Sequence, residues 1–246
     1  MNSNAMTQFN MGMKLPIKHV LAILSGKGGV GKTTIAVQLA LCLKEKGLKV
    51  GILDIDIHGP NVPIILGIED EDLKVKDNKV IPVMFDSIAI VSTYFAAKDK
   101  AIIWRGPLKH KLIMDYLNIV DWPELDFLIV DFPPGTGDET LSFAQLIKNK
   151  VDDVKAIIVS MANDLSIKDA DRAVDFCKKL NLNILGLIEN MSSEIFGKGL
   201  VEDYCNAKEL KFLGRVELSQ NIAKMNQEKK PQCVLHDIVE NILKIY

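Results

Sequence analysis

The chain has 246 residues, of which 48% are hydrophobic and 25% are charged, and its formal net charge is −2. A chain of this length buries a full core without disulfide staples, and its near-neutral charge gives no overall case for a nucleic-acid partner. No run of about 18 apolar residues occurs, so no membrane span is expected.

The first predicted elements follow a short N-terminal segment. Residues 1–6 place Ser3-Asn4-Ala5 before a second methionine, which is typical of an expression scar, so we expect residues 7–246 to form a single domain. Residues 19–25 predict a buried strand that ends in a glycine-rich loop. Residues 34–46 predict a helix that is apolar on most faces, with Gly47 at its end.

Short apolar runs then alternate with amphipathic segments along the rest of the chain. Residues 74–83 predict a hairpin around Asp77-Asn78. Further strands are expected at 50–54, 88–92, 127–131, 156–160, 184–188 and 212–216, and further helices at 108–119, 166–180 and 234–245. This alternation predicts an α/β fold with a doubly wound, mostly parallel sheet and helices on both faces.

The glycine-rich loop carries the clearest chemical signal. Residues 26–33 satisfy G-x-x-x-x-G-K-[S/T], between the strand and the helix that this phosphate-binding pattern requires. Glycines let backbone N–H groups turn toward phosphate oxygens, and the helix N-terminus adds a positive dipole end. We expect Lys32 to reach the β- and γ-phosphates and Thr33 to bind Mg²⁺. The candidate nucleotide-binding residues of this loop are Gly26, Lys27, Gly28, Gly29, Val30, Gly31, Lys32, Thr33 and Thr34.

Three aspartates lie at the ends of predicted strands, where a parallel sheet faces its ligand crevice. Asp131 follows a continuous apolar run and is expected to hold Mg²⁺, through water. Asp54 and Asp56 follow the second strand, and we expect Asp56 to position the attacking water and Asp54 to bind Mg²⁺ or orient water. A turn before Gly59-Pro60 is the alternative explanation for this acidic pair.

The segment from Lys27 to Thr34 resembles the deviant phosphate loop of the MinD/ParA/Mrp class of ATPases. The resemblance implies that Lys27 crosses a homodimer interface to the phosphates held by the partner, where it supplies a charge in trans. From the general loop pattern alone, Lys27 is equally well explained as a solvated loop lysine. The expected catalytic residues are therefore Lys27, Lys32, Asp54 and Asp56.

The segment after Asp131 narrows this resemblance. The sequence Pro-Pro-Gly-Thr-Gly-Asp at 133–138 resembles the Mrp/ApbC family of iron–sulfur cluster carrier ATPases, and the blocks at 104–107, 121–126 and 188–192 agree with it. The resemblance extends from about Lys18 to Pro231. It implies a P-loop α/β domain that dimerises, binds ATP or ADP with Mg²⁺ and hydrolyses ATP slowly.

Two further residues receive roles from the resemblance alone. Gly135 belongs to the loop that would sense the γ-phosphate, and Asn190 would contact the adenine base. By residue type, Asn190 is better explained as a turn residue at the end of a strand.

One departure from the family concerns its [4Fe–4S] cluster, which a Cys-x-x-Cys pair from each subunit binds across the dimer. Here Ser192 continues through Ser-Glu-Ile-Phe-Gly at 193–197, and no cysteine pair follows. We therefore expect the purified protein to carry little or no iron, and any cargo role to use the cysteines of an iron–sulfur scaffold or recipient protein.

The four cysteines are Cys42, Cys177, Cys205 and Cys233, and their wide spacing predicts neither a disulfide scaffold nor a metal-binding CxxC clip. This usage is typical of a reducing cytoplasm. Cys42 and Cys177 are expected to be small core residues. Two copies of Cys205 could meet at a dimer axis, with Cys233 folding back to add further thiolates.

Two other functions stay open on the sequence alone. A MinD/ParA-like positioning or regulatory ATPase would need a membrane helix or a DNA-binding patch. The last predicted helix has a mixed polar face and an apolar stripe typical of core packing, made by Leu235, Ile238, Val239 and Ile242. No basic patch for DNA is evident. The third possibility is an ATPase that loads a different metal cargo.

Overall fold

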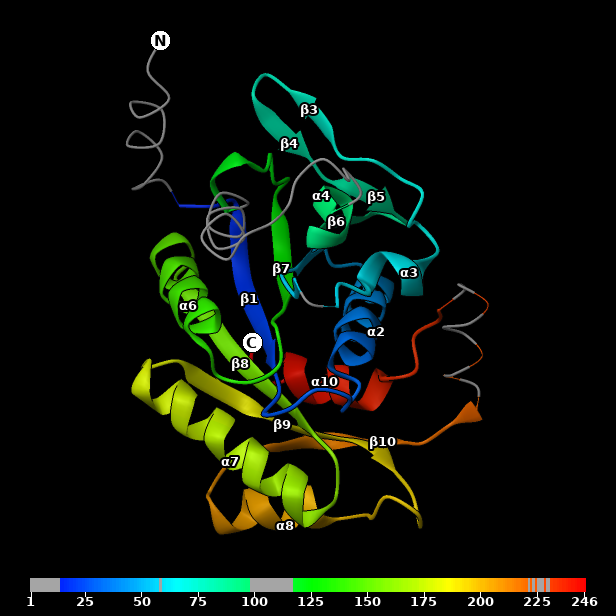
Figure 1. The fold of residues 1–246 in the computed structure, drawn as a ribbon, viewed down its shortest axis with the longest axis vertical. Coiled ribbons are helices and arrows are strands. Elements are labelled where there is room, and N and C mark those ends of the chain that lie inside the picture. Colours follow the sequence, from blue (N-terminus) through cyan, green and yellow to red (C-terminus); the bar gives the residue numbers. More distant parts are fainter. Residues whose placement is uncertain are drawn as a thin grey trace.

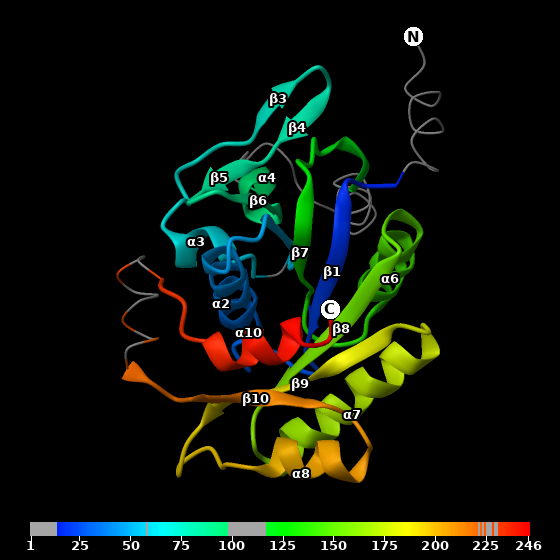
Figure 2. The same ribbon diagram turned by 180° about the vertical axis from the view of Figure 1, so that it is seen from behind.

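The computed structural model describes residues 14–57, 59–97, 117–220, 222, 224, 228 and 231–246. Within these residues, eight strands form one sheet in the order β10-β9-β8-β1-β7-β2-β6-β5, and helices cover both of its faces (Figures 1 and 2). Of the strand pairs in this sheet, only β5 with β6 is antiparallel. The predicted doubly wound, mostly parallel α/β fold is confirmed.

The elements have the following bounds. The strands are β1 (Ile17–Leu24), β2 (Val50–Asp54), β3 (Lys74–Lys76), β4 (Lys79–Ile81), β5 (Val83–Phe85), β6 (Ile88–Ser92), β7 (Leu125–Asp131), β8 (Asp153–Ser160), β9 (Asn183–Ser192) and β10 (Phe212–Glu217). The helices are α2 (Lys32–Glu45), α3 (Val62–Leu66), α4 (Thr93–Ala97), α6 (Asp138–Lys150), α7 (Asp164–Lys179), α8 (Leu200–Ala207) and α10 (His236–Leu243). None of the described helices is both long and apolar enough to cross a membrane.

The central strands are apolar on both faces because each face packs against helices. In β1, Val20, Ala22 and Leu24 belong to the core shared with α6, α7 and α8, whereas Leu21 and Ile23 belong to the core shared with α2, α3 and α10. Side chains alternate across a strand, so burial of both faces produces a continuous apolar run in the sequence. This is the pattern from which the strand was predicted.

Some predicted elements have different bounds in the structure, and the structure contains elements that were not predicted. The predicted hairpin is confirmed as β3 and β4, with Asp77 and Asn78 at positive φ angles of 51° and 62°. Helix α2 begins at Lys32, two residues before the prediction. Helices α3, α4, α6 and α8 and strand β5 were not expected. Residues 1–6, the block at 104–107 and most of the helix expected at 108–119 lie outside the described residues.

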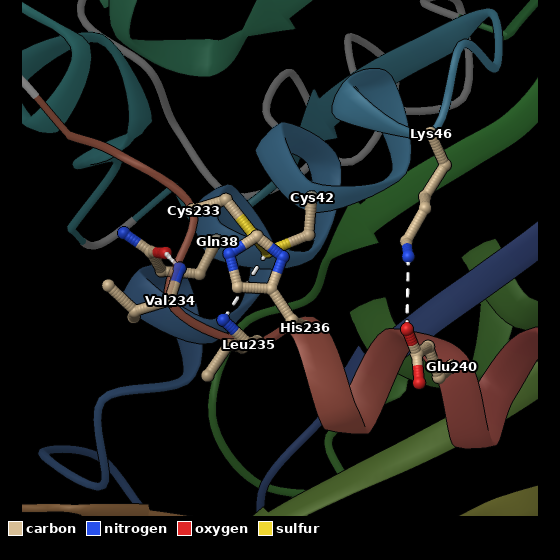
Figure 3. Close-up of a disulfide and its surroundings, with 8 residues drawn as sticks. All are labelled: Gln38, Cys42, Lys46, Cys233, Val234, Leu235, His236 and Glu240. Carbon is tan, nitrogen blue, oxygen red and sulfur yellow. Dashed lines mark hydrogen bonds and ion pairs between the residues drawn. A yellow bond between two sulfur atoms is a disulfide. The ribbon is translucent and has the colours of Figure 1, made fainter.

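The last helix starts at His236 rather than at 234, because the preceding segment bonds to α2 instead. The Val234 backbone N–H donates to the Gln38 side chain at 3.0 Å, and the Leu235 N–H donates to the sulfur of Cys42 at 3.4 Å (Figure 3). The expected apolar stripe of this helix, Leu235, Ile238, Val239 and Ile242, is buried in the core beside α2.

The cysteine spacing predicted no disulfide scaffold, and it did not reveal the one disulfide that the described residues form. Cys42 of α2 and Cys233 form a disulfide between positions 191 residues apart (Figure 3). The sequence gives no spacing signal for this pair, since it is tertiary packing of the 231–235 segment on α2 that brings the two residues together. The idea that Cys205 and Cys233 gather at a dimer axis is wrong: Cys205 is a fully buried residue of α8, in the core on the other face of the sheet from Cys233.

Candidate nucleotide-binding site

The strand order brings the chemically interesting residues to one edge of the sheet. β7 lies between β1 and β2, and in its register Asp131 is the direct partner of both Ile23 on β1 and Asp54 on β2. The loop that leaves β1 therefore passes over two buried aspartates. This edge is the carboxyl edge of the parallel strands, where α/β proteins bind ligands.

A cavity of about 590 Å³ opens at this edge. Its walls are the glycine-rich loop, the segment after β2 and the first turns of α2 and α3. The lining residues are Ser25, Lys27, Gly28, Gly29, Val30, Gly31, Lys32, Thr33, Thr34, Asp56, Gly59, Asn61, Ile64, Ile65 and Pro134. All the predicted loop residues except Gly26 thus meet at one surface.

Two glycines of the loop are required by close packing. Gly31 has a φ of 79° and precedes α2, and a Cβ built there would lie 2.3 Å from the amide nitrogen of Asn190. Gly26 faces away from the cavity, where a Cβ would lie 1.9 Å from the backbone oxygen of Asp169 in α7. Gly26 therefore fixes how closely the loop sits on the neighbouring helix, and it does not line the cavity.

Lys32 and Asp131 form a buried ion pair at the first residue of α2. The lysine ammonium donates a hydrogen bond to Oδ1 of Asp131, and the two side chains are only 6% and 0% exposed. Burial raises the pKa of Asp131, and the charge of Lys32 opposes this rise together with the Thr33 hydroxyl. The second carboxylate oxygen, Oδ2, is buried and has no hydrogen-bond partner among the described residues.

Asp54 is fully buried beneath the cavity wall. Its carboxylate accepts hydrogen bonds from the Ser92 hydroxyl at 2.8 Å and from the Asp56 backbone N–H at 3.1 Å. Burial raises the pKa of Asp54 to about 8, and the neighbouring charge of Asp131 adds to this effect. The sequence analysis did not single out Ser92; it ends β6, the strand beside β2, and only the strand order brings it to Asp54.

Asp56 differs from the other two aspartates because it lines the cavity. Its carboxylate accepts a hydrogen bond from the Gly59 N–H at 3.2 Å, so the acidic pair also makes the turn that was its alternative explanation. The turn and the site are therefore one structure, and the turn presents Asp56 to the cavity.

The residues present fit a Mg²⁺ ion. The Thr33 hydroxyl and the carboxylates of Asp54, Asp56 and Asp131 are the hard oxygen ligands that this ion prefers. The buried Oδ2 of Asp131, without a hydrogen-bond partner among the described residues, is an acceptor that a Mg²⁺-bound water would satisfy.

Two residues named from the family resemblance lie beside the cavity rather than in its lining. Asn190, at the end of β9, donates its side-chain amide to the Val30 backbone oxygen at 2.8 Å. The Gly135 backbone N–H donates to the Ser25 oxygen at 2.9 Å. Both therefore support the loop backbone. The sequence analysis had not named Ser25, Gly59, Asn61, Ile64, Ile65 and Pro134 as site residues, although Gly59-Pro60 and Pro134 belong to segments that it discussed.

Comparison with known proteins agrees with this geometry. The family model described as "ParA: NUBPL iron-transfer P-loop NTPase" matches residues 16–246. The iron-sulfur cluster carrier protein of Aquifex aeolicus is 38% identical over 237 residues, which are 91% of this chain and 64% of that protein, so the chain spans less than two thirds of this relative.

Two further proteins cover the chain more evenly. The cytosolic Fe-S cluster assembly factor Nubp2 homolog of Anopheles gambiae is 36% identical over 93% of this chain and 96% of its own length. A solved nucleotide-binding protein from Archaeoglobus fulgidus, in complex with ADP, superposes with a TM-score of 0.76 at 28% identity, covering 93% of this chain and 92% of that one. The chain belongs to the ParA/NUBPL family of iron-transfer P-loop NTPases.

Proposed function

We propose that this protein binds MgATP in the cavity over α2 and hydrolyses it slowly as a homodimer, in the service of iron–sulfur cluster assembly. The observation that carries the proposal is the buried pair of Lys32 and Asp131 at the start of α2, with Asp54 in register beside it. A phosphate loop that opens over one buried lysine and two buried carboxylates suits a nucleoside triphosphate with its magnesium ion.

Each side chain has a distinct task in this proposal. Lys32 neutralises the β- and γ-phosphates, while the loop N–H groups and the N-terminus of α2 hold the phosphate oxygens. Thr33, Asp54 and Asp131 hold Mg²⁺, with water between the ion and the two buried carboxylates. When bound, Mg²⁺ neutralises charge that develops on the phosphates. Asp56 is the carboxylate exposed to the cavity, so it orients the attacking water.

Lys27 is the residue through which the dimer acts. It is half-buried in the loop and lines the cavity, and among the described residues it makes no ion pair with an acidic side chain. In the proposed dimer, its ammonium crosses to the γ-phosphate bound by the partner subunit. A charge supplied in this way is worth about 10³–10⁵ in rate in related phosphoryl-transfer enzymes.

In this proposed function, the chain carries no [4Fe–4S] cluster on its own cysteines. Cys177 and Cys205 are buried, and burial raises the pKa of each thiol to about 12, which disfavours the thiolate that binds iron. In the turn at 193–197, where the family has its cysteine pair, the exposed side chains include Ile195 and Phe196. Cys42 and Cys233 are joined to each other in a disulfide, so any cluster would be held by cysteines of a partner protein.

Calorimetric titration with MgATP tests the nucleotide part of the proposal. The wild-type chain should bind one nucleotide per subunit, and Lys32→Ala should lose measurable binding because the charge that faces two phosphates is gone. Lys27→Ala is the matched control, since it removes a lysine from the same cavity that takes no part in the buried ion pair with Asp131, and it should still bind. Equal affinity of wild type and Lys32→Ala would refute the assignment.

Anaerobic reconstitution with iron and sulfide tests the cluster part. We expect little acid-labile sulfide and no visible band of a [4Fe–4S] cluster. About four irons and four sulfides per dimer, lost in Cys205→Ser, would contradict the proposal and make the chain a cluster carrier in its own right.

A further inference from the structure

We propose that Cys42, Cys233 and His236 form a metal site that, in the reduced protein, binds one zinc-like divalent ion per chain. The site lies toward the far end of α2 from the phosphate loop, where the segment before α10 packs against the helix (Figure 3). It is distinct from the nucleotide cavity and does not depend on the function proposed above.

Three metal-ligating atoms already converge at this place. The sulfur of Cys233 lies 3.4 Å from Nδ1 of His236, and one ligand atom from each of the three residues lies within 4.8 Å of the others. Ligands around a tetrahedral zinc ion, with Zn–S near 2.3 Å and Zn–N near 2.0 Å, lie about 3.5–3.8 Å apart. The cysteine–histidine pair is therefore close to the required spacing.

The two sulfurs are joined in the structure, so metal binding requires reduction first. A thiol reductant transfers two electrons and two protons to the S–S bond, which gives two thiols and leaves the reductant as a disulfide. The metal ion then displaces the two thiol protons. Because the backbones of Cys42 and Cys233 already lie side by side, with their Cα atoms 4.9 Å apart, side-chain rotation is enough to separate the sulfurs around an ion.

The surroundings suit a thiolate–metal centre. The Leu235 backbone N–H points at the sulfur of Cys42 at 3.4 Å, and a donor of this kind stabilises a metal-bound thiolate. Cys42 is fully buried, whereas His236 is exposed and lines a surface cavity of about 390 Å³ beside β10. The site is thus anchored on a rigid helix and open to solvent on its histidine side.

The donor set selects the kind of ion. Two thiolates and one imidazole are soft to borderline ligands, which favour a zinc-like ion over Mg²⁺ or Ca²⁺. Three protein ligands leave the fourth tetrahedral position to water or to an outside group. Mg²⁺ at the nucleotide site and zinc at this site would therefore not compete, because the two sites offer different donor atoms.

Cobalt titration of the reduced, nucleotide-free, full-length chain tests the proposal. We expect one Co²⁺ per chain, with the intense visible bands of tetrahedral thiolate coordination, and displacement of Co²⁺ by Zn²⁺. Cys233→Ser and His236→Ala should each weaken binding at least about tenfold, the lower end of what even an outer-shell change causes. Cys205→Ser and Asp237→Ala are the matched controls and should bind as the wild type does.

Two results would overturn the site. One is a reduced wild-type chain that binds no Co²⁺, and the other is an affinity that Cys233→Ser and His236→Ala leave unchanged. If either variant fails to fold, alkylation of the reduced wild type decides the question. In the folded, reduced chain, Zn²⁺ should protect Cys42 and Cys233 from modification by iodoacetamide. Cys205, which is labelled in denaturant, should react equally with and without Zn²⁺. Equal labelling of Cys42 and Cys233 with and without Zn²⁺ refutes the proposal, whereas MgATP binding is unaffected either way.

Discussion

Helix α2 joins two regions that differ in chemistry and in how they arise. At its first residue, Lys32 pairs with Asp131, and the surrounding groups are oxygens and backbone N–H groups. Ten residues later, Cys42 meets Cys233 and His236, and the ligands are sulfur and imidazole nitrogen. The first region follows from a local sequence pattern and the strand order, whereas the second follows from the return of the chain 191 residues later. We therefore expect changes at the two regions to affect different properties.

The largest expected effect comes from Lys27 at the phosphate end of α2, by which we mean the region around Lys32 and the glycine-rich loop. Lys27→Ala should reduce ATP hydrolysis by about 10³–10⁵-fold and abolish nucleotide-dependent dimerisation, because the charge supplied across the dimer is lost. Thermal unfolding without nucleotide should not change. Hydrolysis is followed by phosphate release and dimerisation by sedimentation. Monomers of this variant that hydrolyse ATP at the wild-type rate would rule out the trans role.

The next largest effect is expected at the sulfur end of α2, the region of Cys42, Cys233 and His236. It concerns the stability of the protein and not the rate of ATP hydrolysis. Reduction of the Cys42–Cys233 bond releases a very long loop, so the free energy of unfolding should fall by about 2–5 kcal/mol and the Tm by roughly 5–15 °C. Scanning calorimetry of oxidised and reduced chains measures this, with Cys177→Ser as a control that leaves the bond intact. Nucleotide affinity should stay the same, and a large loss of affinity on reduction would show that the two ends of α2 are coupled.

Within the phosphate end, Gly26 contributes to folding and not to the chemistry of the cavity. Gly26→Ala puts a methyl group into the backbone of Asp169, so we expect a loss of about 1–3 kcal/mol in stability from overpacking. Gly28→Ala is the matched control, since a Cβ there would meet only the Pro134 side chain at 3.9 Å. Denaturant unfolding compares the two variants. Similar midpoints for both would mean that the loop moves away from α7 at little cost.

The smallest effect is a pH dependence that originates in Asp54. The folded chain raises the pKa of this carboxyl from 3.8 to about 8 through burial, so the folded state holds the proton more tightly than the unfolded state. Its contribution to stability is therefore complete below about pH 4 and is lost as the pH rises through about 8. The Tm should therefore fall as the pH rises from about 4 to about 8. Asp54→Asn should flatten the profile.

The sequence predicted the strand, the glycine-rich loop and the helix at the Lys32 end of α2 because the signals for these elements are local. The strand, the glycine pattern and the helix follow one another directly, and the apolar runs before Asp54 and Asp131 identify central parallel strands. What it could not supply were contacts between distant segments. Ser92 reaches Asp54 only through the pairing of β2 with β6, and Asn190 reaches the loop backbone only through the packing of β9 against β8 and the loop.

At the sulfur end, contacts between distant segments were even harder to predict from the sequence. Periodicity identified the apolar stripe of the last helix and therefore its burial, but not which helix it would face. Cys42 was expected to be a small core residue, an expectation that describes its burial correctly and its chemistry wrongly. A cysteine in an apolar helix carries no mark of its partner, because a disulfide depends on the distance between side chains and not on their sequence.

The central place of β1 has a consequence for how the chain matures. β1 is the first strand among the described residues, yet its two neighbours, β7 and β8, begin at Leu125 and Asp153. At about 5–20 residues per second of synthesis, this apolar strand leaves the ribosome roughly 5–20 s before its first partner exists. During that interval both of its edges and both of its faces are uncovered. Chaperone binding to the nascent N-terminal segment should therefore matter more for the yield of this protein than for one whose first strand lies at the edge of its sheet.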